Sequence, residues 1–240
     1  MNPPRLIGVG VGPGDPELIT VKAVRVLRAA DVVFVPVMAT GELGRAEATV
    51  RAHVEPGRLR RAVFALGDGH DRGRRHAAWE AAADAVAAAF RDAATTVAFA
   101  TIGDPNLYST FSYLADAVRD RLPDTMVETV PGITAMQALA AASGTVLCEG
   151  TESLALLPLT AGMEAFETAL DRFDTVVAYK GGAVLPELLA LLRAHGRLDD
   201  AVYGAALGLP TEDVRPARDV PDGPGPYLST VLVPPRRGDR

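Results

Sequence analysis

Three short apolar runs, each ending in a turn that contains glycine, constrain the fold of this chain more than any other feature. The runs cover residues 6–11, 96–101 and 126–130, and they lead into Gly12-Pro13-Gly14, Gly103-Asp104-Pro105 and Pro131-Gly132. Helical patterns lie between the runs, and this alternation predicts an α/β protein with a largely parallel sheet. Open sheets of this kind bind ligands just past the carboxyl ends of their strands. The three turns are therefore predicted to lie at a ligand-binding edge.

The same alternation continues along the sequence. Strands are expected over 6–11, 32–35, 61–66, 96–101, 126–130, 154–157, 175–179, 202–207 and 227–233. Helices are expected over 45–53, 76–91, 107–121, 134–142, 165–173 and 184–194, besides one that has Asp15 as its N-cap. Prolines between residues 207 and 227 indicate that the last two strands lie near a sheet edge. The polar break at Pro123-Asp124 predicts two domains, 1–123 and 124–240.

Charge and composition indicate the kind of partner. The formal charge of -6 argues against nucleic acid, because phosphate binding needs a concentrated basic face. No run approaches a membrane span, and the first residues lack the features of a signal peptide. We therefore expect a cytoplasmic protein that binds a small molecule and neither membrane nor nucleic acid. The single cysteine, Cys148, excludes an internal disulfide and a Cys-x-x-Cys metal site.

Two groups of side chains need an interpretation. Arginines gather between residues 58 and 75, where they form either a solvated surface segment or a contribution to binding an acidic ligand. They are Arg58, Arg60, Arg61, Arg72, Arg74 and Arg75. The histidines show no metal-ligand spacing, so no metal site is expected at them. They are His53, His70, His76 and His195.

The first glycine turn excludes two nucleotide-binding motifs. A Rossmann fingerprint that starts at Gly8 needs glycine where Pro13 stands, and a P-loop needs a lysine and a Ser or Thr that are absent here. What is left is a rigid turn whose glycines allow backbone to approach a ligand. The second turn exposes backbone amides and one carboxylate, Asp104, directly after a buried strand.

Together the turns carry a family resemblance. The chain resembles the tetrapyrrole methyltransferases, the class that includes the cobalamin-pathway enzymes and uroporphyrinogen III methyltransferase. The matching segments are GVGPGDPELIT at 10–20 with Lys22-Ala23, ADVV at 30–33, GDP at 103–105 and VPGITA at 130–135. Their order and spacing cover the first 145 residues, and the strand expected before Lys180 extends the match.

Within this class, the segment GDPNLYSTFSYL at 103–114 is most similar to the precorrin-2 carbon-20 branch. A weaker likeness lies in Pro226-Tyr227-Leu228-Ser229. The resemblance implies methylation of precorrin-2 at carbon 20, which gives precorrin-3A in cobalamin biosynthesis. Alternatives are a cobalt-factor II carbon-20, precorrin-4 or uroporphyrinogen III enzyme, or one acting on modified histidine in elongation factor 2. The segment Gly44-Arg45 departs from the commoner pattern, which has serine near position 45.

The resemblance also implies a fold and a site. It implies two α/β domains with mostly parallel sheets and a cofactor cleft between them, S-adenosylmethionine as methyl donor, no metal, and a homodimer. The residues that match the family's donor contacts are Pro13, Gly103, Asp104, Leu107, Thr134, Ala135, Lys180 and Leu207. Asp104 either faces the sulfonium or stiffens its turn. The residues expected at the tetrapyrrole are Arg45, Tyr108 and Tyr113, where the tyrosines are alternatively core residues of the expected helix.

The sequence leaves the remaining chemistry open. Methyl transfer from a sulfonium is an in-line displacement that needs alignment and exclusion of water more than an acid or a metal. No catalytic base is identified, and no motif separates a metal-free substrate from a cobalt-containing one. A non-catalytic binding module or a nicotinamide enzyme on a similar sheet is the remaining alternative, which failure to bind S-adenosylmethionine would favour.

Overall fold

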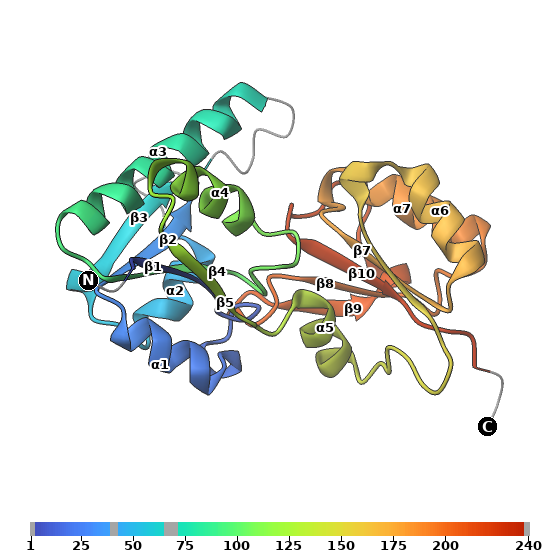
Figure 1. The fold of residues 1–240 in the computed structure, drawn as a ribbon. Coiled ribbons are helices and arrows are strands. Elements are labelled where there is room, and N and C mark those ends of the chain that lie inside the picture. Colours follow the sequence, from blue (N-terminus) through green and yellow to red (C-terminus); the bar gives the residue numbers. More distant parts are fainter. Residues whose placement is uncertain (1–2, 39–42, 65–71, 238–240) are drawn as a thin grey trace. The chain divides into compact units, whose positions relative to one another are not determined.

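The computed structural model describes residues 3–38, 43–64 and 72–237, apart from the side chains of Arg72, Arg74 and Arg75. The chain divides into two compact units, Met1–Thr134 and Ala135–Arg240 (Figure 1). The boundary lies further along the chain than the break predicted at Pro123-Asp124. The reason is that the strand following this break pairs with the first strand of the chain, so it belongs to the first unit.

In the first unit, the strands that the structure describes form a parallel sheet of order β3-β2-β4-β1-β5. They are β1 (Arg5–Gly10), β2 (Val32–Val37), β3 (Leu59–Val63), β4 (Thr96–Thr101) and β5 (Met126–Val130). The central strands β1 and β4 are buried along nearly their whole length. Burial on both faces explains their continuous apolar sequences, because helices cover both sides of a parallel sheet.

The helices of this unit pack in two layers, one on each face of the sheet (Figure 1). One layer holds α1 (Val21–Ala29) and α2 (Arg45–Arg51), and the other holds α3 (Arg72–Arg91) and α4 (Phe111–Arg121). Short 3-10 helices cover Pro16–Leu18 and Pro56–Arg58. Asp15 does cap a helix, but it is the first 3-10 turn, where its carboxylate accepts from the Glu17 N–H at 2.8 Å. Thr20 caps α1 itself.

In the second unit the described strands form a mixed sheet of order β6-β7-β10-β8-β9. They are β6 (Leu154–Pro158), β7 (Thr175–Tyr179), β8 (Val202–Ala205), β9 (Asp213–Pro216) and β10 (Ser229–Val233). Among these described strands only β6 and β7 pair in parallel, and the other three pairings are antiparallel. Parallel pairing therefore prevails in the first unit, as predicted, and the second sheet differs from it in being mixed.

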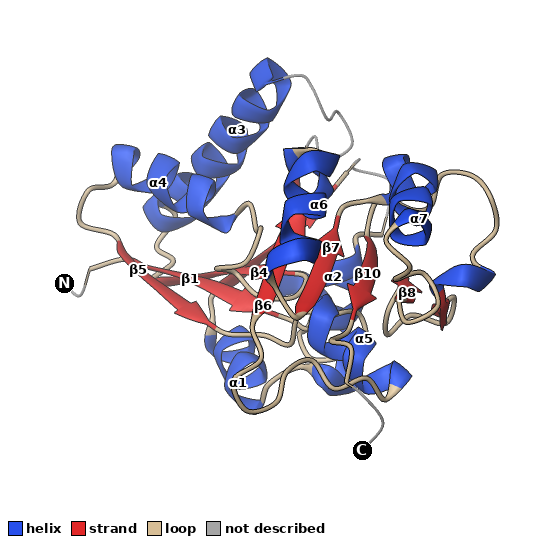
Figure 2. Ribbon diagram, turned by 90° about the vertical axis from the view of Figure 1, so that its right-hand side faces the viewer, coloured by secondary structure: helices blue, strands red, loops and turns tan. Residues whose placement is uncertain are grey.

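Helices also cover both faces of the second sheet. The helix α5 (Ala135–Ser143) packs on one face, and α6 (Met163–Arg172) and α7 (Leu185–Ala194) pack on the other (Figure 2). Short 3-10 helices cover Leu159–Ala161, Gly182–Val184 and Ala217–Asp219. An apolar layer thus lies between each face of the sheet and the helices that cover it. This arrangement confirms the α/β class for both units.

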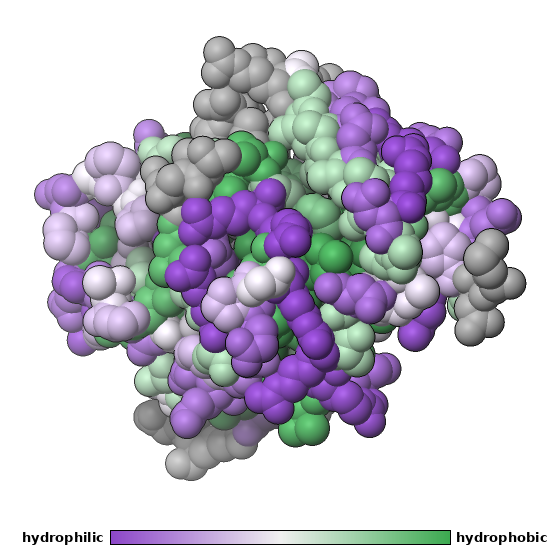
Figure 3. Space-filling view, turned by 90° about the vertical axis from the view of Figure 1, so that its left-hand side faces the viewer, coloured by the Kyte–Doolittle hydropathy of each residue, from purple (hydrophilic) through white to green (hydrophobic). Residues whose placement is uncertain are grey.

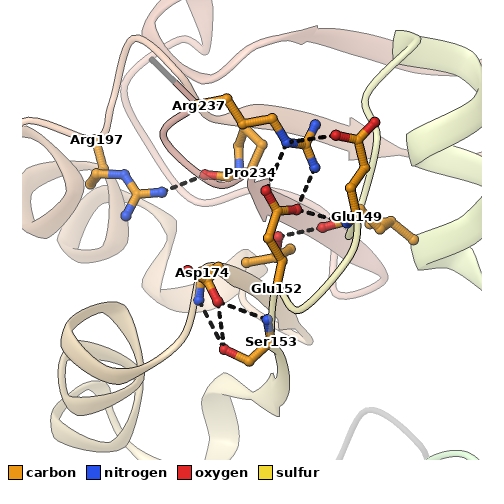
Figure 4. Close-up of polar contacts among 9 residues, drawn as sticks. Glu149, Glu152, Ser153, Asp174, Arg197, Pro234 and Arg237 are labelled. Carbon is orange, nitrogen blue, oxygen red and sulfur yellow. Dashed lines mark hydrogen bonds and ion pairs between the residues drawn. The ribbon is translucent and has the colours of Figure 1, made fainter.

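The last described residues are tied to the loop between α5 and β6. Arg237 makes a bidentate contact with the Glu152 carboxylate, with nitrogen-to-oxygen distances of 2.9 and 2.6 Å, and it also approaches Glu149 (Figure 4). Arg197 donates to the Pro234 carbonyl. These contacts hold the segment after β10 against its own unit. No described helix is both long and apolar enough to cross a lipid bilayer.

Candidate active site

The three glycine turns converge at one edge of the first sheet. Because β1, β4 and β5 are parallel, and β1 lies between the other two, the turns leave the sheet side by side. The Val11 N–H donates to the Thr101 carbonyl at 3.0 Å, and the Gly103 N–H donates to the Gly12 carbonyl at 2.7 Å. The first two turns are therefore joined beyond the ends of their strands.

Glycine is required at this junction because the three backbones are in contact. A Cβ on Gly132 would lie 2.1 Å from the Gly103 carbonyl oxygen and 2.8 Å from backbone atoms of Gly10. A Cβ on Gly10 would lie 2.5 Å from the same oxygen. Real Cβ atoms do not approach backbone this closely. The turns therefore form a compact surface in which main-chain atoms take the place of side chains. We call Gly10, Gly103 and Gly132 the glycine junction.

Asp104 connects two of these turns through its side chain. Its Oδ1 accepts from the Asn106 N–H at 2.8 Å, and its Oδ2 accepts from the Gly132 N–H at 2.9 Å. Asn106 in turn donates from Nδ2 to the Thr129 hydroxyl at 3.2 Å. Of the two roles expected for Asp104, this geometry supports the one that stiffens the turn, because both carboxylate oxygens accept backbone N–H groups.

The other donor residues predicted in the first unit lie around this junction. Pro13 is buried between two glycines with positive φ, Gly12 at 81° and Gly14 at 158°. The Cα of Thr134 lies 3.9 Å from the position that a Cβ on Gly103 would take. Leu107 is half-buried, and its N–H donates to the Asp104 carbonyl at 3.3 Å.

The donor residues predicted in the second unit occupy two strand ends and a helix start. Ala135 is the first residue of α5. Lys180 follows β7 with a φ of 58°, and burial lowers the pKa of its ammonium group. Leu207 follows β8, is only 5% exposed and packs with Leu139 and Leu232. The Leu207 side chain is thus a core residue, so a ligand contact there would involve its backbone.

The residues expected at the tetrapyrrole are in three different settings. Arg45 begins α2, is half-buried, and burial lowers the pKa of its guanidinium. Tyr108 lies outside the helix expected from residue 107, because α4 starts at Phe111 and Tyr108 has a φ of 50°. Tyr113 lies on α4, is 53% exposed and stacks on Trp79 with ring centroids 4.4 Å apart. The two tyrosines line one surface pocket of about 440 Å³, so they are not core residues, whereas Arg45 does not line it.

The family follows from sequence comparison. A family model for Tetrapyrrole (Corrin/Porphyrin) Methylases matches residues 5–219. The chain belongs to this family. The match spans all three glycine turns and continues through both units, so the resemblance inferred from the turns is confirmed.

Two relatives of this tetrapyrrole methylase are similar to it over most of their length. A precorrin-2 C(20)-methyltransferase from Sinorhizobium sp is 36% identical over 96% of this chain and 95% of the relative. A probable cobalt-precorrin-2 C(20)-methyltransferase from Methanocaldococcus jannaschii is 34% identical over 87% of this chain and 84% of the relative. Among solved structures, a putative cobalamin synthesis related protein (CobF) from Corynebacterium diphtheriae has a TM-score of 0.69 at 20% identity, covering 97% of this chain and 99% of that one.

The arginine cluster of this tetrapyrrole methylase is largely structural where the structure describes it. Arg58 donates to the Arg28 carbonyl at 2.6 Å, and Arg61 pairs with the buried Glu47 at 2.8 Å. Arg60 donates to the carbonyls of neighbouring residues. The side chains of Arg72, Arg74 and Arg75 lie outside the described residues, as does His70.

The described histidines have ordinary surface partners. His53 Nε2 lies 3.0 Å from the Pro16 carbonyl, His195 Nε2 lies 3.0 Å from the Glu167 carboxylate, and His76 packs edge-on against Trp79. Within the described residues, no group of three or more His, Cys, Asp or Glu side chains could hold a metal ion.

Sequence reasoning missed two residues that hold elements of the two units in place. Glu47 is 2% exposed and accepts hydrogen bonds from Arg51 and Arg61. Burial alone would raise the pKa of Glu47, but the hydrogen bonds from these arginines outweigh it and hold the pKa below its usual range. Tyr179 accepts a hydrogen bond from α5. The Glu47–Arg51 pair has the i, i+4 spacing that a helix sequence can signal. The contacts of Glu47 with Arg61 and of Tyr179 with α5 join segments far apart in sequence, so no local pattern signals them.

Proposed function

We propose that the protein transfers a methyl group from S-adenosylmethionine to carbon 20 of precorrin-2, giving precorrin-3A in cobalamin biosynthesis. The observation that carries this proposal is the glycine junction, a main-chain surface at the carboxyl edge of a parallel sheet. Membership of the tetrapyrrole methylases supports the reaction class. The carbon-20 position is supported by the 36% identity to the Sinorhizobium enzyme over nearly the whole of both chains.

The proposed donor contacts are those expected from the sequence. In the first unit they are Pro13, Gly103, Asp104, Leu107 and Thr134. In the second unit they are Ala135, Lys180 and Leu207. Backbone suits this task because fixed N–H and C=O groups hold a ligand without the side-chain entropy loss of long polar residues. When bound, S-adenosylmethionine supplies an electrophilic methyl on a sulfonium whose leaving sulfide departs neutral.

The protein's part in such a displacement is alignment. The attacking carbon and the methyl must lie about 3–3.5 Å apart and in line with the departing sulfur. A rigid junction serves this need, since the hydrogen bonds of Asp104 keep two turns in fixed register. Exclusion of water is the second requirement. The pocket lined by Tyr108 and Tyr113 is a site at which an apolar macrocycle face could be covered.

A tetrapyrrole with carboxylate side arms needs local cations on a chain with a charge of -6. We propose Arg45, Arg72, Arg74 and Arg75 for this role. Arg58, Arg60 and Arg61 are weaker choices, because they already hold carbonyls and a carboxylate. We further propose, from the family resemblance alone, that the protein works as a cytoplasmic homodimer, which light scattering of the purified protein would test.

The decisive experiment locates the transferred methyl. Purified protein is incubated with S-adenosylmethionine carrying a carbon-13 methyl and, in separate reactions, with precorrin-2, cobalt-precorrin-2 or uroporphyrinogen III. We expect one new methyl at carbon 20 with precorrin-2 or its cobalt form, seen by carbon NMR and mass analysis. The more efficient of these two substrates is the physiological form. Methylation of uroporphyrinogen III alone would contradict the proposal, as would no binding of the donor by calorimetry.

A further inference from the structure

Tyr179 ends β7 and reaches the start of α5. Its hydroxyl oxygen accepts the Met136 N–H at 2.7 Å. The strand holding it is fixed on both sides, since Tyr179 pairs with Pro158 of β6 and with Thr230 of β10. Its side chain packs on the apolar layer that includes Leu139 of α5. The tyrosine is therefore a strut between a sheet and the first turn of a helix.

This contact supplies what a helix start lacks. The first N–H groups of an α-helix have no partner within the helix, so they need an acceptor from elsewhere. In most helices a Ser, Thr, Asp or Asn at the N-cap provides the acceptor. Here the Met136 N–H is satisfied by an aromatic hydroxyl from a distant strand. The position of the helix start thus depends on Tyr179 as well as on its own sequence.

Both ends of this strut adjoin residues proposed to hold the donor. Ala135 directly precedes Met136, and Lys180 directly follows Tyr179. The Lys180 turn is itself constrained, since it has a φ of 58°, and Gly182 beyond it packs so closely on residues 225 and 226 that a Cβ would lie 2.2 Å from the Pro226 carbonyl oxygen. One hydrogen bond therefore ties together the segments of Ala135 and Lys180, two of the three donor contacts proposed in the second unit.

We propose that Tyr179 is a positioning residue for the methyl donor. It fixes the start of α5 against the Lys180 turn, so that the backbone groups of these two segments keep a constant position relative to each other when they contact the donor. This inference rests on the proposed function. It assigns Tyr179 a role in donor affinity and no contact with the reacting atoms.

The test is the Tyr179→Phe variant, which removes the hydroxyl and keeps the ring. We expect the Kd for S-adenosylhomocysteine in calorimetry and the KM for S-adenosylmethionine each to rise about fivefold to tenfold, the scale of one lost hydrogen bond. The KM for the tetrapyrrole and the kcat at saturating donor should stay within about twofold. Hydrogen exchange of residues 135–138 should quicken even without ligand.

The matched control is Tyr203→Phe. Tyr203 lies on β8 of the same sheet, is 3% exposed and is no part of the proposed site. The same loss of a hydroxyl there should leave donor affinity and exchange at 135–138 unchanged. Wild-type donor affinity and wild-type exchange in Tyr179→Phe would overturn the positioning role alone, as would equal losses for donor and tetrapyrrole. Absence of donor binding by the wild-type protein would overturn the proposed function and this inference with it.

Discussion

At the scale of single residues, the glycine junction shows how a missing side chain can be the functional feature. The Gly103 carbonyl oxygen sits where a Cβ of either Gly10 or Gly132 would be. The obstructing atoms are backbone, so no rotation of a side chain can relieve the overlap. The proposed donor site and the packing of the turns therefore depend on the same three positions.

Substitution Gly132→Ala tests this dependence. Its Cβ would force the turns apart, and we expect a loss of about 1–3 kcal/mol in the free energy of unfolding, typical of overpacking. Donor affinity should fall more than tenfold, because the turns proposed to bind the donor move. Urea denaturation and calorimetry with S-adenosylhomocysteine measure the two effects.

Gly57→Ala is the matched control, since Gly57 is exposed and no described atom lies within 4 Å of its would-be Cβ. We expect a change within about 0.5 kcal/mol, as for most surface substitutions, and unchanged donor affinity. Similar behaviour of the two variants would contradict the importance of close backbone packing.

Asp104 gives a second prediction at this scale, because its two possible roles differ in charge. Asp104→Asn replaces one acceptor oxygen by an NH2 donor, which cannot accept from Asn106 or Gly132. We expect stability to fall by about 0.5–1.5 kcal/mol, typical of one lost hydrogen bond, because Asp104 is half-buried. If the role is to fix the turns, the variant should lose affinity for S-adenosylmethionine and S-adenosylhomocysteine by the same factor. A selective loss for the cationic sulfonium, measured by parallel titrations, would favour a direct charge contact instead.

At the scale of elements, α2 is held to its sheet by a buried charge. Glu47 accepts from Arg51 of the same helix and from Arg61 of β3. The folded-state pKa of Glu47 lies below its usual range. Its stabilising contribution is therefore full above the unfolded pKa of about 4.3, and it is lost as the pH falls through the lower folded value.

Glu47→Gln should remove this contribution. We expect a loss of about 1.5–3 kcal/mol at pH 7, as for hydrogen bonds to charged groups. The stability of the variant should also fall less steeply than that of the wild type as the pH drops through and below the unfolded pKa of about 4.3, because only the wild type loses this contribution there. Denaturant unfolding across this range is the measurement.

Glu128→Gln is the control, because the Arg5–Glu128 pair is more than 40% exposed on both sides and should contribute under about 1 kcal/mol. Equal slopes for wild type and Glu47→Gln would contradict the assignment.

Elements with strong local signals were predictable from sequence, and elements defined by distant partners were not. The continuous apolar run of β4 and the alanine-rich α3 need no tertiary information. The strand β9 was missed, because the four residues Asp213–Pro216 contain no apolar run. Among the described strands, β9 pairs with β8 alone. Prolines before β10 suggested an edge, yet β10 is buried between β7 and β8. A proline in a loop restricts the conformation of that loop, and it does not indicate where in the sheet the following strand lies.

The candidate site also combines parts with local sequence signals and parts that depend on distant residues. Its main-chain parts were predictable, since glycine and proline turns after strands are readable as local sequence. The helix start near Tyr108 was misplaced, because Ser109 accepts from the Phe111 N–H and delays the helix. The role of Asp104 depends on Gly132, 28 residues away. Spacing along the sequence cannot show which of several hydrogen-bond partners a carboxylate meets.

At the scale of the whole molecule, the two units have the same layered packing of helices on a sheet but differ in the directions of their strands. Both cover a five-stranded sheet of described strands with helices on each face. The first unit exposes a mixed polar and apolar surface on the side seen in Figure 3. Alternating apolar runs predict the layers equally well in both units. They do not encode strand direction, because a buried antiparallel strand such as β10 is as apolar as a parallel one.

Donor binding should couple to the stability of both units. A ligand that binds only the folded state at one hundred times its Kd adds about 2.7 kcal/mol to the free energy of unfolding. We expect S-adenosylhomocysteine at that concentration to give this gain in the wild type and, because its Kd is raised more than tenfold, less than about half of it in Gly132→Ala. Hydrogen exchange then locates the effect. Protection is expected around residues 103–107 in the first unit and around 135–137 and 180–182 in the second, because contacts are proposed in each. Protection confined to the first unit would remove Ala135, Lys180 and Leu207 from the donor site while leaving the glycine junction in place.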